Sequence, residues 1–243
     1  MLMLRICRQN GCMVLHASPH AGTQDVASTT AVEAVLKRAG GDRDRLLERF
    51  NRAVRRPESF GGLAGLEVLL DQIARAEQQS VDTVWIPDTN ARLSPSTMLR
   101  EFFADPDIHV AASQYGEDAY RRGWLCLDRA LTPAEHAVLV DAAVTWSRTD
   151  RTVHDIVAEF GPASVTFGDP DPRRPKTLSY AGSDRNAPVV AFHLGPARAG
   201  TSPSSERSPV VGAPLLGVRV CDDFFGRWEL TPYGEAFLEA APE

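Results

Sequence analysis

The spacing of apolar residues changes near residue 161, and this change limits most strongly what the chain can fold into. Before it, apolar side chains recur at the three- and four-residue intervals of a helix face, most clearly over residues 42–55. After Gly161 and Pro162, apolar and polar residues alternate, which is typical of strands with one buried face. The sequence therefore predicts an α+β protein whose helical N-terminal half is followed by a sheet.

Several of the predicted helices begin at a capping residue. Thr132 is followed by Pro133 and Glu135, the pattern of a capping box with proline at the first helical position. Thr152 opens a shorter helix that Gly161 ends. The predicted helices cover residues 30–37, 42–55, 63–78, about 94–103, 132–146 and 152–160.

Strands are predicted after the last of these helices. Their links are short or irregular and contain no crossover helix, so we expect a helix-flanked antiparallel sheet of about five strands. Trp228 shares a strand face with Leu230 and is expected to be buried under a helix. The strands are expected near residues 165–167, 177–180, 188–194, 214–220 and 224–230, with short additional strands at 81–87 and 123–127.

The pattern also suggests how the chain divides. We expect residues 1–25 to be disordered or to precede the true translation start, residues 26–128 to form a mainly helical region, and residues 129–243 to form the antiparallel α+β domain. A single continuous domain over 26–243 is the alternative. The link 195–213 is rich in Gly, Pro and Ser and is expected to be a mobile insertion between strands.

Composition excludes some classes of function. The formal net charge of −6 supplies no basic field that would attract nucleic acid or anionic lipid. No apolar run approaches the roughly twenty residues that a membrane-spanning helix needs. Arg5 and Arg8 interrupt the apolar N-terminal stretch, so it is not expected to be a signal peptide. We therefore expect a cytoplasmic protein with reduced cysteines.

Metal, cofactor and standard catalytic motifs are not predicted. Cys7, Cys12, His16 and His20 follow one another too closely for a zinc finger, because no room remains for ordered structure between the ligand pairs. The chain also contains no phosphate-binding loop, dinucleotide fingerprint or nucleophile elbow.

One acidic segment remains as a catalytic candidate. Asp105, Asp107 and His109 are spaced at period two, so on a strand all three side chains would point the same way. Such a group can hold a divalent cation or act as acid and base. A proline-containing turn with solvated carboxylates is the simpler interpretation.

Arginine carries the strongest indication of a binding surface. Helical spacing places Arg45, Arg49, Arg52 and Arg56 along one face, where guanidinium groups can bind phosphates or an acidic partner. A solvated helix face is the ordinary alternative for such a charge run. Residues 169–176, "DPDPRRPK", form a second basic spot on an expected hairpin loop.

The C-terminal stretch "RWELTPYGEAF" has the strand-then-helix order that also occurs at the wing of winged-helix DNA-binding domains. That fold needs a recognition helix directly before the wing strands, and here several predicted strands intervene. Capping by Thr231 with Pro232 at the first helical position explains the joint without DNA.

These observations predict a non-enzymatic protein that binds another macromolecule, with an unidentified protein as the expected partner. An immunity or antitoxin-type protein is one form of this hypothesis. A winged-helix-like DNA-binding regulator is the alternative. A hydrolase or transferase that uses Asp105, Asp107 and His109 is the second alternative.

Overall fold

The computed structural model describes residues 42–77, 108–196, 212–221 and 227–240. All of them belong to one compact unit, Gly40–Glu243. The helices predicted at 30–37 and 94–103, the strand at 81–87 and most of the 195–213 insertion lie outside the described residues.

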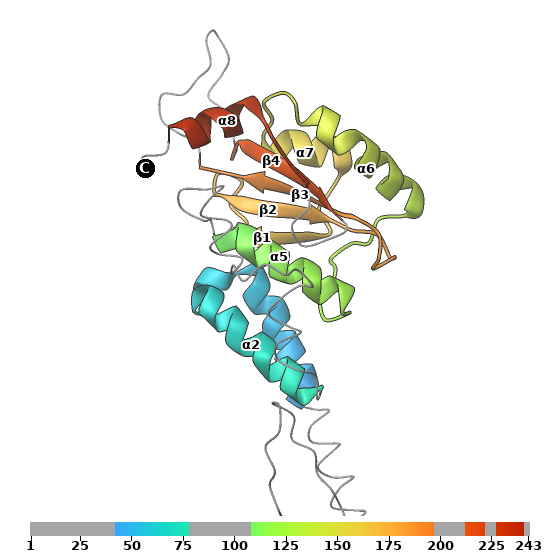
Figure 1. Cartoon of the computed structure of the whole chain (residues 1–243), viewed down its shortest axis with the longest axis vertical. Helices are drawn as coiled ribbons and strands as arrows, with labels where there is room; N and C mark the ends of the chain where they lie inside the picture. The colour runs from blue at the N-terminus through green and yellow to red at the C-terminus, as the bar shows by residue number, and fades with distance from the viewer. Residues whose placement is uncertain (1–41, 78–107, 197–211, 222–226, 241–243) are drawn as a thin grey trace, which may run out of the picture. The chain divides into compact units, whose positions relative to one another are not determined.

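The sheet is an antiparallel meander, as the alternating pattern predicts (Figure 1). Each strand pairs with the next one along the chain, so the spatial order equals the chain order. The strands are β1 (Val165–Gly168), β2 (Lys176–Tyr180), β3 (Val189–Leu194), β4 (Leu215–Cys221) and β5 (Arg227–Leu230).

The helices largely follow the predicted ranges. Residues 42–55 are helical, and Pro57 begins the short 3-10 helix η1 (Pro57–Phe60). The remaining helices among the described residues are α2 (Gly62–Ala76), α5 (Ile108–Arg121), α6 (Pro133–Trp146), α7 (Val153–Phe160) and α8 (Pro232–Glu239).

The caps read from the sequence are present in the structure. The hydroxyl of Thr132 accepts from the backbone N–H of Glu135, whose carboxylate accepts in return from the N–H of Thr132. Thr152 forms the same reciprocal box with Asp155 at the start of α7. Thr231 caps α8 by accepting from the N–H of Gly234. Local chemistry thus fixes where these helices begin.

One face of the sheet is apolar and is covered by α6 and α7 (Figure 1). Leu178, Val190 and Phe192 point to this face from successive strands and are buried. Leu139 and Ile156 pack against them from the two helices. This half of the core is what period-two alternation in the strands predicts.

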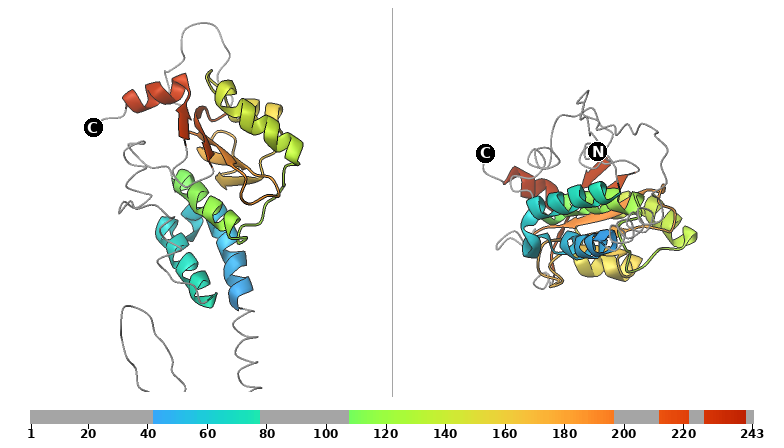
Figure 2. Two further views of the ribbon diagram at one scale, coloured as in Figure 1. Left: turned by 45° about the vertical axis from the view of Figure 1, so that its right-hand side comes forward. Right: turned by 90° about the horizontal axis from the view of Figure 1, so that it is seen from below.

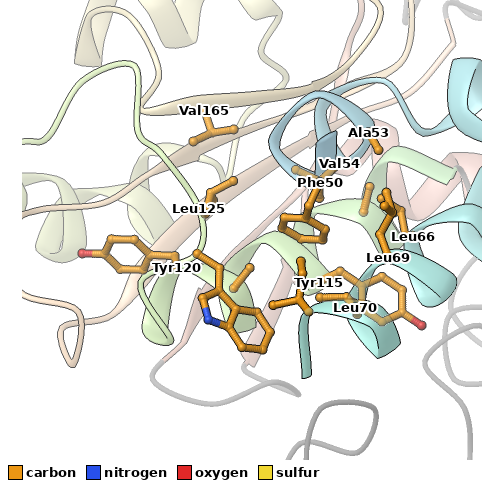
Figure 3. Packing of buried hydrophobic residues seen from close by; sticks show 14 of the residues in the cluster. Phe50, Ala53, Val54, Leu66, Leu69, Leu70, Tyr115, Tyr120, Leu125 and Val165 are labelled. Atoms are coloured by element: carbon orange, nitrogen blue, oxygen red, sulfur yellow. The ribbon is translucent and has the colours of Figure 1, made fainter. Parts of the chain in front are cut away.

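The other face carries α5, which in turn contacts the antiparallel pair formed by helix 42–55 and α2 (Figure 2). Figure 3 shows the apolar cluster that joins these elements. Its buried members from the two N-terminal helices are Phe50, Ala53, Val54, Leu66, Leu69, Leu70, Ile73 and Ala74.

Two predictions for residues 104–131 are wrong. His109 is the second residue of the helix α5 and does not lie on a strand. Residues 123–127 form no strand, because their backbone groups bond to side chains and to a helix end. The carbonyl of Trp124 accepts from Nδ2 of Asn51, and the N–H of Cys126 donates to Oδ1 of the same side chain.

Trp228 departs in part from its prediction. It lies on β5 and is half-buried, with its ring stacked on that of His193.

Among the described helices, none combines the length and the apolar character needed to span a lipid bilayer.

Candidate functional site: an arginine-lined pocket

The end of helix 42–55 places arginines next to an aromatic ring. Pro57 cannot continue the helix, and it restricts the backbone of the residue before it. Arg56 accordingly leaves the helix with φ −138° and ψ 60°, and the chain turns through η1 to Phe60. Because of this turn, Arg55, Arg56 and Phe60 all lie beside β1, the edge strand of the sheet.

An open pocket of about 400 Å³ lies between this helix end and strand β1. Three guanidinium groups, one carboxylate and one aromatic ring contribute to its wall. Its lining residues are Arg52, Arg55, Arg56, Phe60, Asp128, Thr166, Gly168 and Pro170. We call this the arginine pocket.

Arg55 is fixed within the pocket wall by hydrogen bonds. Its Nη2 donates to the carbonyl of Cys126 over 2.6 Å and to Oδ1 of Asp128 over 3.0 Å. Its Nη1 donates to the carbonyl of Asn51 over 3.0 Å. The charge of Arg55 is therefore matched by Asp128, and the side chain joins helix 42–55 to the segment that precedes α6.

Arg52 and Arg56 make weaker or fewer contacts with the rest of the described protein than Arg55 does. Arg52 approaches Glu48 at 3.6 Å, but both side chains are exposed, so this ion pair contributes little. Arg56 is half-buried and makes no ion pair with any of the described residues. Arg45 and Arg49, the other members of the predicted stripe, are exposed on the same helix and do not line the pocket.

The second basic spot lies at the pocket rim. Lys176 is 2 % exposed, and its ammonium donates to the carbonyls of Asp169 and Asp171, on either side of the lining residue Pro170. Burial lowers the pKa of Lys176, the Asp169 and Asp171 carboxylates oppose that shift, and the nearby Arg56 charge adds to it. The two basic segments seen in the sequence thus meet at one place.

Gly168 shapes the rim through its backbone. Its φ of +104° is rare for residues with a side chain, and an added Cβ would lie 3.1 Å from the carbonyl oxygen of Pro175 and 3.2 Å from Cβ of His109. The loop then turns with Asp169 and Asp171 accepting backbone N–H groups, which leaves Arg173 and Arg174 exposed.

A second polar cluster lies under α5, on the sheet face opposite α6 and α7. Oγ1 of Thr177 lies 2.9 Å from Nδ1 of His109 and 2.9 Å from Nδ1 of His193. A hydroxyl has one proton to donate, so at least one of the two rings must carry its proton on Nδ1. Burial lowers the pKa of His193 well below its ordinary value, and the Arg219 and His109 charges act in the same direction.

An ion pair continues this buried cluster. Nη2 of Arg219 donates to Glu117 over 2.6 Å, with both side chains at most 4 % exposed, and Nη2 of Arg121 donates to the other carboxylate oxygen over 2.9 Å. A neighbouring cavity of about 10 Å³, lined in part by Ser113, Glu117 and Ser179, has room for about one water molecule. The cluster is therefore closed to larger ligands.

The structure brings only part of the predicted sites together. Asp105 and Asp107 lie outside the described residues, and His109 is 4 % exposed within the closed cluster. Within the described ranges, no group of three His, Cys, Asp or Glu side chains could hold a metal ion.

Arg52 and Arg56 of the stripe line the pocket, whereas Arg55 and Phe60 were not among the predicted site residues. The sequence signal for them is Pro57, which ends the helix and redirects the residues on both sides of it.

Comparison of the chain with protein-family models, with curated proteins and with solved structures finds no match.

Proposed function

We propose that this chain is a cytoplasmic, non-enzymatic protein that binds a protein partner, and that the arginine pocket receives an acidic segment of that partner. The observation that carries the proposal is the open pocket in which three arginines near the end of the stripe meet the loop 169–176 at Pro170, with Lys176 of that loop close to Arg56. Guanidinium groups present paired donors that match carboxylate geometry.

The charges in and beside the pocket support an extended anionic ligand. Arg56 has no carboxylate partner among the described residues. The exposed Arg52–Glu48 ion pair is weak, so a carboxylate of a bound ligand can replace Glu48 at little cost. Arg45 and Arg49 are exposed further along the same helix, so a longer acidic segment can contact them as well. An immunity or antitoxin-type protein that captures its target in this way is one form of the proposal.

Nucleic acid is the less favoured ligand. The net charge of −6 works against long-range attraction of a phosphate backbone. Arg52, Arg55 and Arg56 also line a pocket, whereas nonspecific nucleic-acid binding uses an extended positive groove that follows the backbone.

A titration of a fluorescently labelled oligoglutamate peptide by anisotropy tests the proposal. We expect binding that weakens with salt, and a loss of at least about tenfold in the variant R52Q/R56Q, since hydrogen bonds to charged groups contribute roughly 1.5–3 kcal/mol each. Glutamine is a comparable helix former, so the helix should persist.

The matched control is R45Q/R49Q, which removes the same charge from the same helix outside the pocket. It should lose less affinity than R52Q/R56Q, because Arg45 and Arg49 can contact only the part of the peptide that extends beyond the pocket. Equal losses in both variants, or no peptide binding at low salt, would contradict the proposal. Tight binding of duplex DNA with steep salt dependence would instead favour a nucleic-acid regulator.

A further inference from the structure

The charge balance of the arginine pocket points to a dianion. Three guanidinium groups face one carboxylate in its lining, and that carboxylate, Asp128, is paired with Arg55. Arg56, which has no ion pair among the described residues, and Arg52, whose exposed contact with Glu48 is weak, remain in the lining to receive an anion. A single carboxylate brings one negative charge, whereas a phosphate monoester brings about −1.5 to −2 at neutral pH and three acceptor oxygens.

A further cation, Lys176, is bonded to the loop that supplies the lining residue Pro170. The buried Lys176 ammonium is close enough to Arg56 for the two positive charges to oppose each other. Its proton donors point at the carbonyls of Asp169 and Asp171, so it fixes the rim rather than reaching into the open space. The Asp169 and Asp171 carboxylates attract Lys176 more strongly than Arg56 repels it, and an anion beside Arg56 adds to this attraction, more so the greater its charge.

The pocket is larger than a phosphate group needs. A volume of about 400 Å³ lies in the range of small-molecule sites, about 300–1,000 Å³. Phe60 and Pro170 contribute apolar residues to the lining, and Thr166 contributes a further polar residue. In a phosphate monoester, the phosphate can contact the arginines while the attached organic group packs against the apolar residues.

We infer that the arginine pocket binds a phosphate monoester, with Arg52 and Arg56 on the phosphate oxygens and Phe60 beside the attached organic group. This inference rests on the proposed function and specifies the anion that the pocket prefers. The same chemistry is offered by a phosphorylated side chain of a partner protein and by a free phosphorylated metabolite.

Calorimetric titration of phenyl phosphate and of benzoate tests the preference for phosphate. We expect phenyl phosphate to bind at least about tenfold more tightly than benzoate. Its affinity should fall below about pH 6, where a phosphate monoester takes up a proton. R52Q/R56Q should abolish binding, and R45Q/R49Q should retain it. Equal affinities for the two ligands would overturn the inference.

Two further titrations distinguish the sources. A neutral peptide with one phosphoserine, measured against its unphosphorylated form, represents a partner protein, and a nucleoside monophosphate represents a metabolite. Tighter binding of either one identifies the source and supports the inference.

The two proposals can also fail separately. If oligoglutamate binds in the pocket and neither phosphate ligand is preferred, the inference fails and the proposed function stands. If no anion binds, both fail.

Discussion

At the scale of single residues, the Thr177 hydroxyl makes two buried contacts at once. One hydroxyl on β2 contacts a histidine on α5 and another on β3, so it joins the helix to the sheet inside a closed polar cluster. Buried polar atoms that lose their partners cost more than the bond itself contributed, because water cannot replace the lost contact.

The variant T177V therefore tests the cluster directly. Valine keeps the shape of threonine but leaves Nδ1 of both His109 and His193 without the Thr177 hydroxyl. We expect a loss of about 1–3 kcal/mol in the free energy of unfolding, measured by urea denaturation. T177S keeps the hydroxyl and should lose less. A T177V protein as stable as T177S would show that the hydroxyl does not hold the cluster together.

At the scale of elements, α5 lies unusually close to the sheet. A Cβ added at Gly116 would come within 2.5 Å of ring atoms of Phe167 on β1. Alanine normally favours a helix over glycine by up to about 1 kcal/mol, so an unhindered G116A would be stabilising.

We expect the opposite sign for G116A. The clash should destabilise the protein by about 1–3 kcal/mol in urea denaturation, as overpacking of a core typically does. Combining G116A with F167L removes the ring atoms in question, so the double variant should lose less than the sum of the two single variants. Additive losses would mean that Phe167 is not the obstacle.

Helix α5 also shows which part of the fold could not be predicted from the sequence. The five strands and the caps at Thr132 and Thr152 could be predicted, because alternation and capping are local signals. Helix α5 could not, since several of its buried residues are polar, so its buried surface does not read as apolar in the sequence.

Segment 123–127 was predicted as a strand because it is apolar, but its backbone groups find no strand partner. The N–H groups of Trp124 and Leu125 bond to Ala119 at the end of α5, and two further groups bond to the Asn51 side chain, on a helix more than seventy residues away. The pocket residues divide in the same way between those that local signals predict and those that only the fold brings in. Arg52 and Arg56 could be predicted from one helix, whereas Thr166 joins them only through the fold.

At the scale of the whole molecule, the two faces of the sheet differ in chemistry. One face carries an apolar core beneath α6 and α7. The other carries the buried His109, His193, Glu117 and Arg219 beneath α5. Stability should therefore depend on pH through the second face.

His193 sets the direction of that dependence. The folded protein holds His193 neutral, next to Arg219, His109, Thr177 and the stacked Trp228, because burial lowers its pKa. In the unfolded chain its pKa returns to about 6.5, so the unfolded state binds the extra proton first. The contribution of His193 is complete above about pH 6.5 and is lost as the pH falls below that value.

Urea denaturation between about pH 7.5 and pH 5 should show this loss, with a slope of up to about 1.4 kcal/mol per pH unit from one histidine. H193Q should have a shallower slope even though it is less stable at neutral pH. The comparison also separates His193 from Asp118, whose raised pKa acts in the opposite sense. An identical slope in the two proteins would exclude His193 as the cause.

The burial of Lys176 has a practical consequence for chemical modification. The chain contains two lysines, Lys37 and Lys176, and only 2 % of Lys176 is exposed in the folded protein. Amine-directed dyes, cross-linkers and surface-coupling reagents will therefore leave Lys176, and with it the rim of the arginine pocket, unmodified.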